Sequence, residues 1–119
     1  MNRPAAAARD ATRAFLVRAA HVRAPVKDES TDNVLLVVTE LVANAIRHTV
    51  GPCALHLELL DGSIDVCVTD RNPQPPQPRT PGTDGSGGWG WFMIKRLATR
   101  IRINPVPGGG KTICAVLPW

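Results

Sequence analysis

The length, composition and charge of the chain indicate one globular domain. Its 119 residues, 44% of them hydrophobic and 20% charged, have an ordinary soluble composition and leave little room for a second folded unit. No apolar run reaches the roughly 18 residues that a membrane-spanning helix needs. The net charge of +4 permits an acidic partner, but no nucleic-acid-binding motif accompanies it. We therefore expect neither membrane insertion nor direct nucleic-acid binding.

The N-terminus and the cysteines indicate the compartment. Arg9, Asp10 and Arg13 interrupt the alanine-rich start of the chain, which therefore lacks the apolar core of a signal peptide. Three widely separated cysteines fit neither a zinc spacing nor a complete disulfide framework: Cys53, Cys67 and Cys114. We expect a cytoplasmic protein in which the cysteines are unpaired and buried as small hydrophobic residues.

The first half of the chain predicts two helices. Over residues 6–22, apolar side chains recur at the three- and four-residue spacings of an amphipathic helix: Ala8, Ala11, Phe15, Ala19 and Val22. Residues 28–32 offer several helix-capping side chains and first-turn acids. A second, more apolar helix is expected over residues 34–49, closed by Gly51 and Pro52.

The second half predicts strands. Residues 53–60 and 63–69 are separated by Asp61-Gly62, a strong hairpin signal. Residues 71–88 are rich in proline and glycine and have no period, which is typical of a functional loop. A short helix over 89–99 and strands over 100–104 and 111–117 follow. Clustered hairpins without βαβ units favour an α+β fold, a two-layer sandwich in which helices cover one face of a mainly antiparallel sheet.

Polar residues form a stripe on the second predicted helix. Glu40, Asn44 and His48 fall within about 80° of one another, and Arg47 lies close to Glu40. An ordinary solvent-facing side would look the same. The nine residues 40–48, however, resemble the N-box of the GHKL (Bergerat-fold) ATPases, in particular of the anti-sigma-factor serine/threonine kinases and their stand-alone relatives.

This resemblance implies roles for the stripe. Asn44 would ligate the Mg²⁺ that bridges the phosphates of ATP, and Glu40 would act as general base. Arg47 and His48 match the family string and would lie near the phosphates. The residue types suit this chemistry, because an amide oxygen is a hard ligand for Mg²⁺ and a carboxylate can deprotonate a hydroxyl.

Asp70 stands where this family has the aspartate that accepts a hydrogen bond from the adenine amino group. The two glycines that usually follow it are absent here. A turn-initiating aspartate is the alternative interpretation. Thr112, in the last predicted strand, matches a threonine whose hydroxyl supports the adenine site beside this aspartate.

A glycine-rich stretch before the third predicted helix resembles the box that closes the ATP lid of the family. It includes Gly87, Gly88 and Gly90, and glycines of this kind let main-chain amides approach phosphate oxygens. We expect the lid itself at about residues 71–88. The four segments occur in family order, so the resemblance extends over about residues 6–117.

The resemblance implies an ATP- and Mg²⁺-binding regulator of the anti-sigma-factor type. Its partners would be a sigma factor, a STAS-like anti-anti-sigma factor that it phosphorylates on serine or threonine, or a second copy in a homodimer. The alternative is a non-catalytic module in which ATP only orders a surface that partners bind. The intact Glu40 favours the kinase, and the missing glycines after Asp70 favour the alternative.

Overall fold

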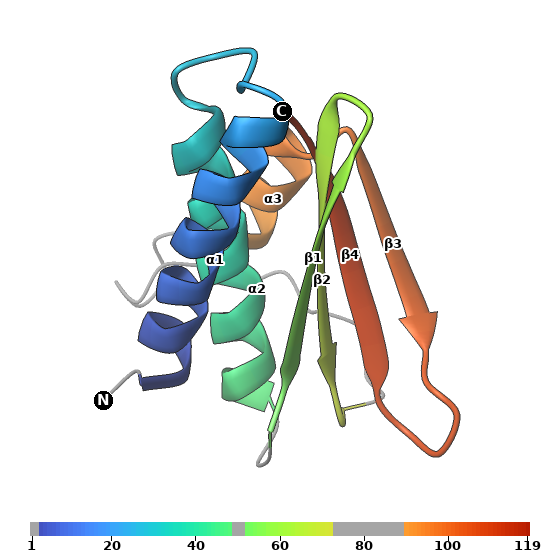
Figure 1. Cartoon of the computed structure of the whole chain (residues 1–119). Helices are drawn as coiled ribbons and strands as arrows, with labels where there is room; N and C mark the ends of the chain where they lie inside the picture. The colour runs from blue at the N-terminus through green and yellow to red at the C-terminus, as the bar shows by residue number, and fades with distance from the viewer. Residues whose placement is uncertain (1–2, 49–51, 73–89) are drawn as a thin grey trace.

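The protein is an α+β sandwich with helices on one face of an antiparallel sheet, as the sequence predicts. The computed structural model describes residues 3–48, 52–72 and 90–119. The sheet order is β1-β2-β4-β3, and all neighbours are antiparallel. Figure 1 shows the helices packed on one side of this sheet. The described elements are α1 (Arg3–Val22), α2 (Ser30–His48), β1 (Ala54–Leu60), β2 (Ser63–Asp70), α3 (Gly90–Leu97), β3 (Arg100–Pro105) and β4 (Lys111–Pro118).

Helix α1 packs through most of the predicted face, since Ala8, Phe15 and Ala19 lie in the core or against it. Ala11 and Val22 are exposed, whereas Thr12 and Leu16 are buried. Thr12 tolerates burial because its hydroxyl donates to the carbonyl of Ala8 at 2.7 Å. The alanine-rich sequence is compatible with two overlapping buried faces of the helix, because small side chains can be either buried or exposed. Among the helices described, none combines the length and the apolar character of a membrane span.

Helix α2 forms the centre of the core. It begins at Ser30, four residues earlier than predicted, since Asn33 N–H already donates to the carbonyl of Glu29 at 2.9 Å. Its apolar side chains pack between α1 and the sheet. The buried members are Val34, Val37, Val38, Leu41, Val42 and Ala45.

The strands alternate between an inner face, against the helices, and an outer face. In β2 the inner residues Ile64, Val66 and Val68 are buried in the core, and Asp65 and Cys67 occupy the outer face. Gly62, at a φ of 76°, makes the predicted turn between β1 and β2.

The prediction of three unpaired cysteines is wrong for two of them. Cys67 and Cys114 are register partners on β2 and β4 and form a disulfide. Cys53 remains free and is half-buried. A sequence separation of 47 residues gives no sign of this pairing, because it depends on the register of two strands.

Trp119 connects the helical layer to the sheet, a role that the sequence analysis does not predict. The side chain is fully buried, and its Nε1 donates to the carbonyl of Arg23 at 2.8 Å. Its backbone N–H donates to Gly62 at 3.0 Å, and its carbonyl accepts from Val26 N–H. The last residue therefore ties the α1–α2 connection to the hairpin of the sheet.

Candidate functional site

The predicted polar stripe lies on one helix, α2, and runs along its C-terminal half. Glu40 and Asn44 are half-buried on α2, and Arg47 is exposed. His48 is the last residue of α2, and its side chain lies outside the described residues. Helix α2 packs against α3 and also against strands β2 and β4. Glu40 and Asn44 are thus one turn apart on the helix that contacts every other element of the candidate site.

Gly90, the first residue of α3, lies against Glu40. A Cβ atom built on Gly90 would overlap Oε2 of Glu40. Any larger residue at this position would have to push the carboxylate away. The structure thereby joins two segments that the sequence analysis selected separately. The other two glycines of the predicted box, Gly87 and Gly88, lie outside the described residues, as does most of the predicted lid.

Asp70 ends β2 with its carboxylate on the inner face, 3% exposed. Its Oδ1 accepts from the N–H of Asn72 at 2.8 Å. Lys111 Nζ lies 3.0 Å from Oδ1 and 3.1 Å from Oδ2. The turn hydrogen bond to Asn72 agrees with the alternative interpretation of Asp70, but the buried ion pair goes beyond what a turn requires.

Lys111 is the residue of this site that the sequence analysis missed. It is the register partner of Asp70 and is itself only 3% exposed. Besides the two carboxylate oxygens it donates to the carbonyl of Asn72 at 3.0 Å, so its three N–H donors have three acceptors. A lysine at the start of a buried, alternating strand is the signal that could have revealed it.

Thr112 does not lie beside the carboxylate of Asp70. It pairs in register with Thr69, and the two hydroxyls share a hydrogen bond of 2.8 Å on the outer face. Since neighbouring strand residues point to opposite faces, the inward position next to Asp70 belongs to Lys111. Gly110 permits this approach: it has a φ of 96°, and a Cβ there would overlap the carbonyl oxygen of Asp70.

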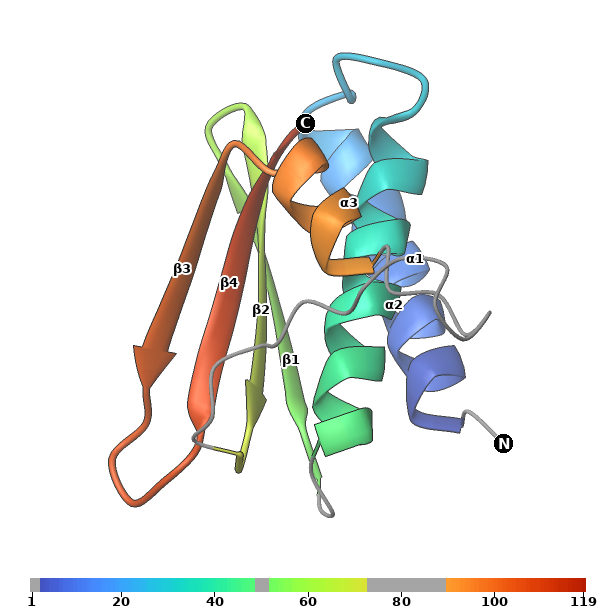
Figure 2. The same cartoon turned by 180° about the vertical axis from the view of Figure 1, so that it is seen from behind.

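The ends of three elements gather at one end of the molecule. Figures 1 and 2 show the C-terminal end of α2, the end of β2 and the start of β4 at the same end. Asp70 and Lys111 lie at this end on the inner face of the sheet, and Asn44 lies in the last turns of α2.

Comparison with protein families decides the identification. The model of the histidine kinase-like ATPase domain matches residues 2–117. The chain belongs to this family. ATPase domains of the family bind ATP, usually together with Mg²⁺. No curated protein matches the chain in sequence.

A solved structure supports the same fold. The chain resembles the histidine kinase domain of the blue-light activated histidine kinase from Erythrobacter litoralis EL346, with a TM-score of 0.54 and 19% sequence identity. The match covers 76% of this chain but only 45% of that one, so the chain spans less than half of the kinase domain's length. At this identity the likeness concerns the fold alone, and it confirms the predicted α+β sandwich.

The hydrogen bonds of the Asp70 carboxylate are compatible with the binding of a nucleotide. A carboxylate has about four lone-pair positions, and the bonds to Asn72 and Lys111 use three of them. Among the described residues, the fourth position, on Oδ2, has no donor and suits an exocyclic amino group. Asn44 supplies the amide oxygen that suits Mg²⁺. The donors and acceptors present are thus compatible with ATP and Mg²⁺ in this ATPase domain.

Proposed function

We propose that this ATPase domain is a regulator of the anti-sigma-factor type that binds ATP with Mg²⁺ and phosphorylates serine or threonine on a STAS-like partner. The observation that carries the proposal is the contact between Glu40 and Gly90. It places a carboxylate of α2 at the first residue of α3, where the glycine-rich segment ends. A base and a phosphate-binding segment must be neighbours for phosphoryl transfer.

Each residue of the site has a role in this proposal. Asn44 holds Mg²⁺ through its amide oxygen, and Asp70 accepts a hydrogen bond from the adenine amino group. Arg47 and His48 stand near the phosphates. Bound ATP supplies the phosphoryl group. Lys111 keeps the Asp70 carboxylate in a fixed orientation through two short contacts.

Glu40 takes the proton in the transfer step. As the hydroxyl oxygen of the partner's serine or threonine bonds to the terminal phosphorus, its proton passes to the Glu40 carboxylate. The bond between that phosphorus and the bridging oxygen breaks, and ADP leaves. The half-buried position of Glu40 limits its contact with water.

A non-catalytic, ATP-dependent binding module is the second candidate, and the Lys111 contacts favour it. Lys111, on β4, contacts the Asp70 carboxylate and the carbonyl of Asn72. Asn72 belongs to the first residues of the predicted lid. Nucleotide binding at Asp70 would then act on the lid through this one lysine. Partner binding would follow nucleotide binding without any transfer.

A single-turnover assay with ATP labelled on its terminal phosphate and candidate STAS-like proteins separates the two candidates. The kinase proposal predicts transfer by the wild type, loss of transfer in Glu40→Gln and retained ATP binding in that variant. Glu29→Gln is the matched control, because Glu29 is an exposed residue just before α2, and it should keep both activities. ATP-dependent partner binding without transfer would support the module instead.

A further inference from the structure

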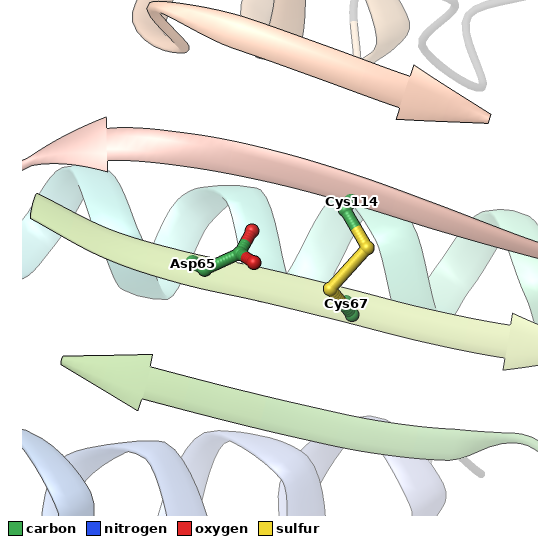
Figure 3. Close-up of side chains that lie close together, drawn as sticks. All are labelled: Asp65, Cys67 and Cys114. Carbon is green, nitrogen blue, oxygen red and sulfur yellow. A yellow bond between two sulfur atoms is a disulfide. The ribbon is translucent and has the colours of Figure 1, made fainter. Parts of the chain in front are cut away.

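The outer face of the sheet carries a second cluster that the proposed function does not use. Asp65 and Cys67 are two residues apart on β2 and therefore point to the same side. Cys114 lies opposite Cys67 on β4, with 4.1 Å between the two Cα atoms. One carboxylate oxygen and the two sulfur atoms all lie within 4.8 Å of one another. Figure 3 shows the three side chains together on these two strands.

Asp65 is only half satisfied in this cluster. Its Oδ2 accepts from Nη2 of Arg102 at 3.0 Å, a side chain that reaches across β4 from β3. Its Oδ1 is buried and has no hydrogen-bond partner within the described part of the chain, although the residue is only 8% exposed. A buried carboxylate oxygen without a partner is costly. Once the disulfide is reduced, a cation held by Asp65 and the two sulfur atoms would remove that cost.

Strand β1 adds two further groups on the same face. His56 is the register partner of Cys67, and Glu58 is the register partner of Asp65. Two carboxylates directly opposite each other repel, which again favours a cation nearby. The His56 side chain is 69% exposed, with Nε2 3.8 Å from Oε1 of Glu58. Cross-strand partners have Cβ atoms about 5 Å apart, so the imidazole can turn toward Cys67.

We propose that the dithiol form of this cluster binds Zn²⁺ through Cys67, Cys114 and Asp65, with His56 as the fourth ligand. Thiolate, imidazole and carboxylate are the donors that zinc takes in tetrahedral sites. The charges also balance. Zn²⁺ with two thiolates and one carboxylate has a net charge of −1, which the guanidinium of Arg102 beside Asp65 neutralises.

The disulfide and the zinc site exclude each other, because both use the same two sulfur atoms. Reduction of the Cys67–Cys114 bond by a dithiol transfers two electrons and two protons, giving two thiols and a cyclic disulfide of the reductant. Zinc binding then releases the two thiol protons. Oxidation by a small-molecule disulfide reverses the process and sets the metal free. The cluster would thus hold zinc only under reducing conditions.

Titration of the fully reduced protein with Zn²⁺ tests the proposal. Thiol counting should first give three thiols with an unchanged circular dichroism spectrum, since three cysteines are present. One Zn²⁺ should then bind per chain, measured against a chromophoric chelator. Co²⁺ in its place should give the charge-transfer absorption of cobalt–thiolate bonds. Adding oxidised glutathione should release the metal.

Variants identify the ligands. Cys67→Ser and Cys114→Ser should abolish Zn²⁺ binding, and Asp65→Asn and the exposed His56→Gln should weaken it about tenfold or more. Cys53→Ser is the matched control and should bind as the wild type does. Absence of Zn²⁺ binding by the reduced, folded chain would overturn the proposal. So would loss of binding in Cys53→Ser, full affinity in His56→Gln, or a disulfide that can be reduced only by unfolding the protein.

Discussion

Asp65 and Asp70 lie on the same strand, β2, but on opposite faces of the sheet. Each is paired with a cation from another strand, Asp65 with Arg102 and Asp70 with Lys111. The inner carboxylate has both oxygens bonded and is 3% exposed. The outer one has an oxygen without a partner among the described residues. Within the described residues, the Asp70 carboxylate keeps one acceptor position on Oδ2, whereas Asp65 has a whole oxygen atom without a partner.

Removing the lysine of the inner pair should have the largest effect on stability. Lys111→Met leaves the buried Asp70 carboxylate without its cation, and breaking a buried pair from one side costs about 3 to 5 kcal/mol. Urea denaturation measures the loss in the free energy of unfolding. Adding Asp70→Asn should recover much of it, because the uncompensated charge is then gone. A loss below about 1 kcal/mol in Lys111→Met would contradict the described pair.

The same substitution in the outer pair should cost less. The Arg102 side chain is 33% exposed, so water screens part of the charge that it leaves on Asp65. Arg102→Met is expected to lower the free energy of unfolding by about 1 to 2 kcal/mol. Denaturation under the same conditions as for Lys111→Met gives the comparison. Equal losses of unfolding free energy in Lys111→Met and Arg102→Met would show that the two ion pairs contribute equally to stability.

Thr112→Val tests whether the threonine hydroxyl contributes to ATP binding or only to the outer face of the sheet. The substitution removes one half of the Thr69–Thr112 hydrogen bond on the outer face, at a cost of about 1 kcal/mol. The affinity for ATP should not change, because the inward position belongs to Lys111. Calorimetry of the variant with ATP measures this. A clear loss of affinity would restore the sequence-based role of Thr112 at the adenine.

Gly90→Ala should change stability least and function most. The new methyl group displaces only the end of the flexible Glu40 side chain, and alanine is the better helix former by up to about 1 kcal/mol. The net change in stability should therefore stay within about 1 kcal/mol. Phosphoryl transfer, in contrast, should fall at least about tenfold, because the base is moved. Unchanged single-turnover transfer would show that the Glu40–Gly90 contact has no part in catalysis.

The sequence predicts the parts of the fold that local patterns encode. The Asp61-Gly62 turn and the alternation of β2 gave the hairpin, and residues 40–48 gave the motif on α2. The Cys67–Cys114 bond and the Asp70–Lys111 pair were not predicted. Both depend on how β2 registers with β4, more than 40 residues later. A shift by one residue would exchange the inner and outer faces, and the register decides that Lys111 rather than Thr112 lies on the inner face beside Asp70.

Calorimetric titration with ATP, first with Mg²⁺ and then with a chelator, tests whether this domain binds the nucleotide through the metal. Binding should weaken when Mg²⁺ is removed, and Asn44→Ala should make binding insensitive to the metal. The same titration with GTP should show weaker binding, because Asp70 would meet the carbonyl oxygen of guanine rather than an amino group. That mismatch costs about 1 to 3 kcal/mol, or roughly ten- to a hundredfold in affinity. A folded protein that binds no ATP at millimolar concentration would contradict the assignment of this site to ATP.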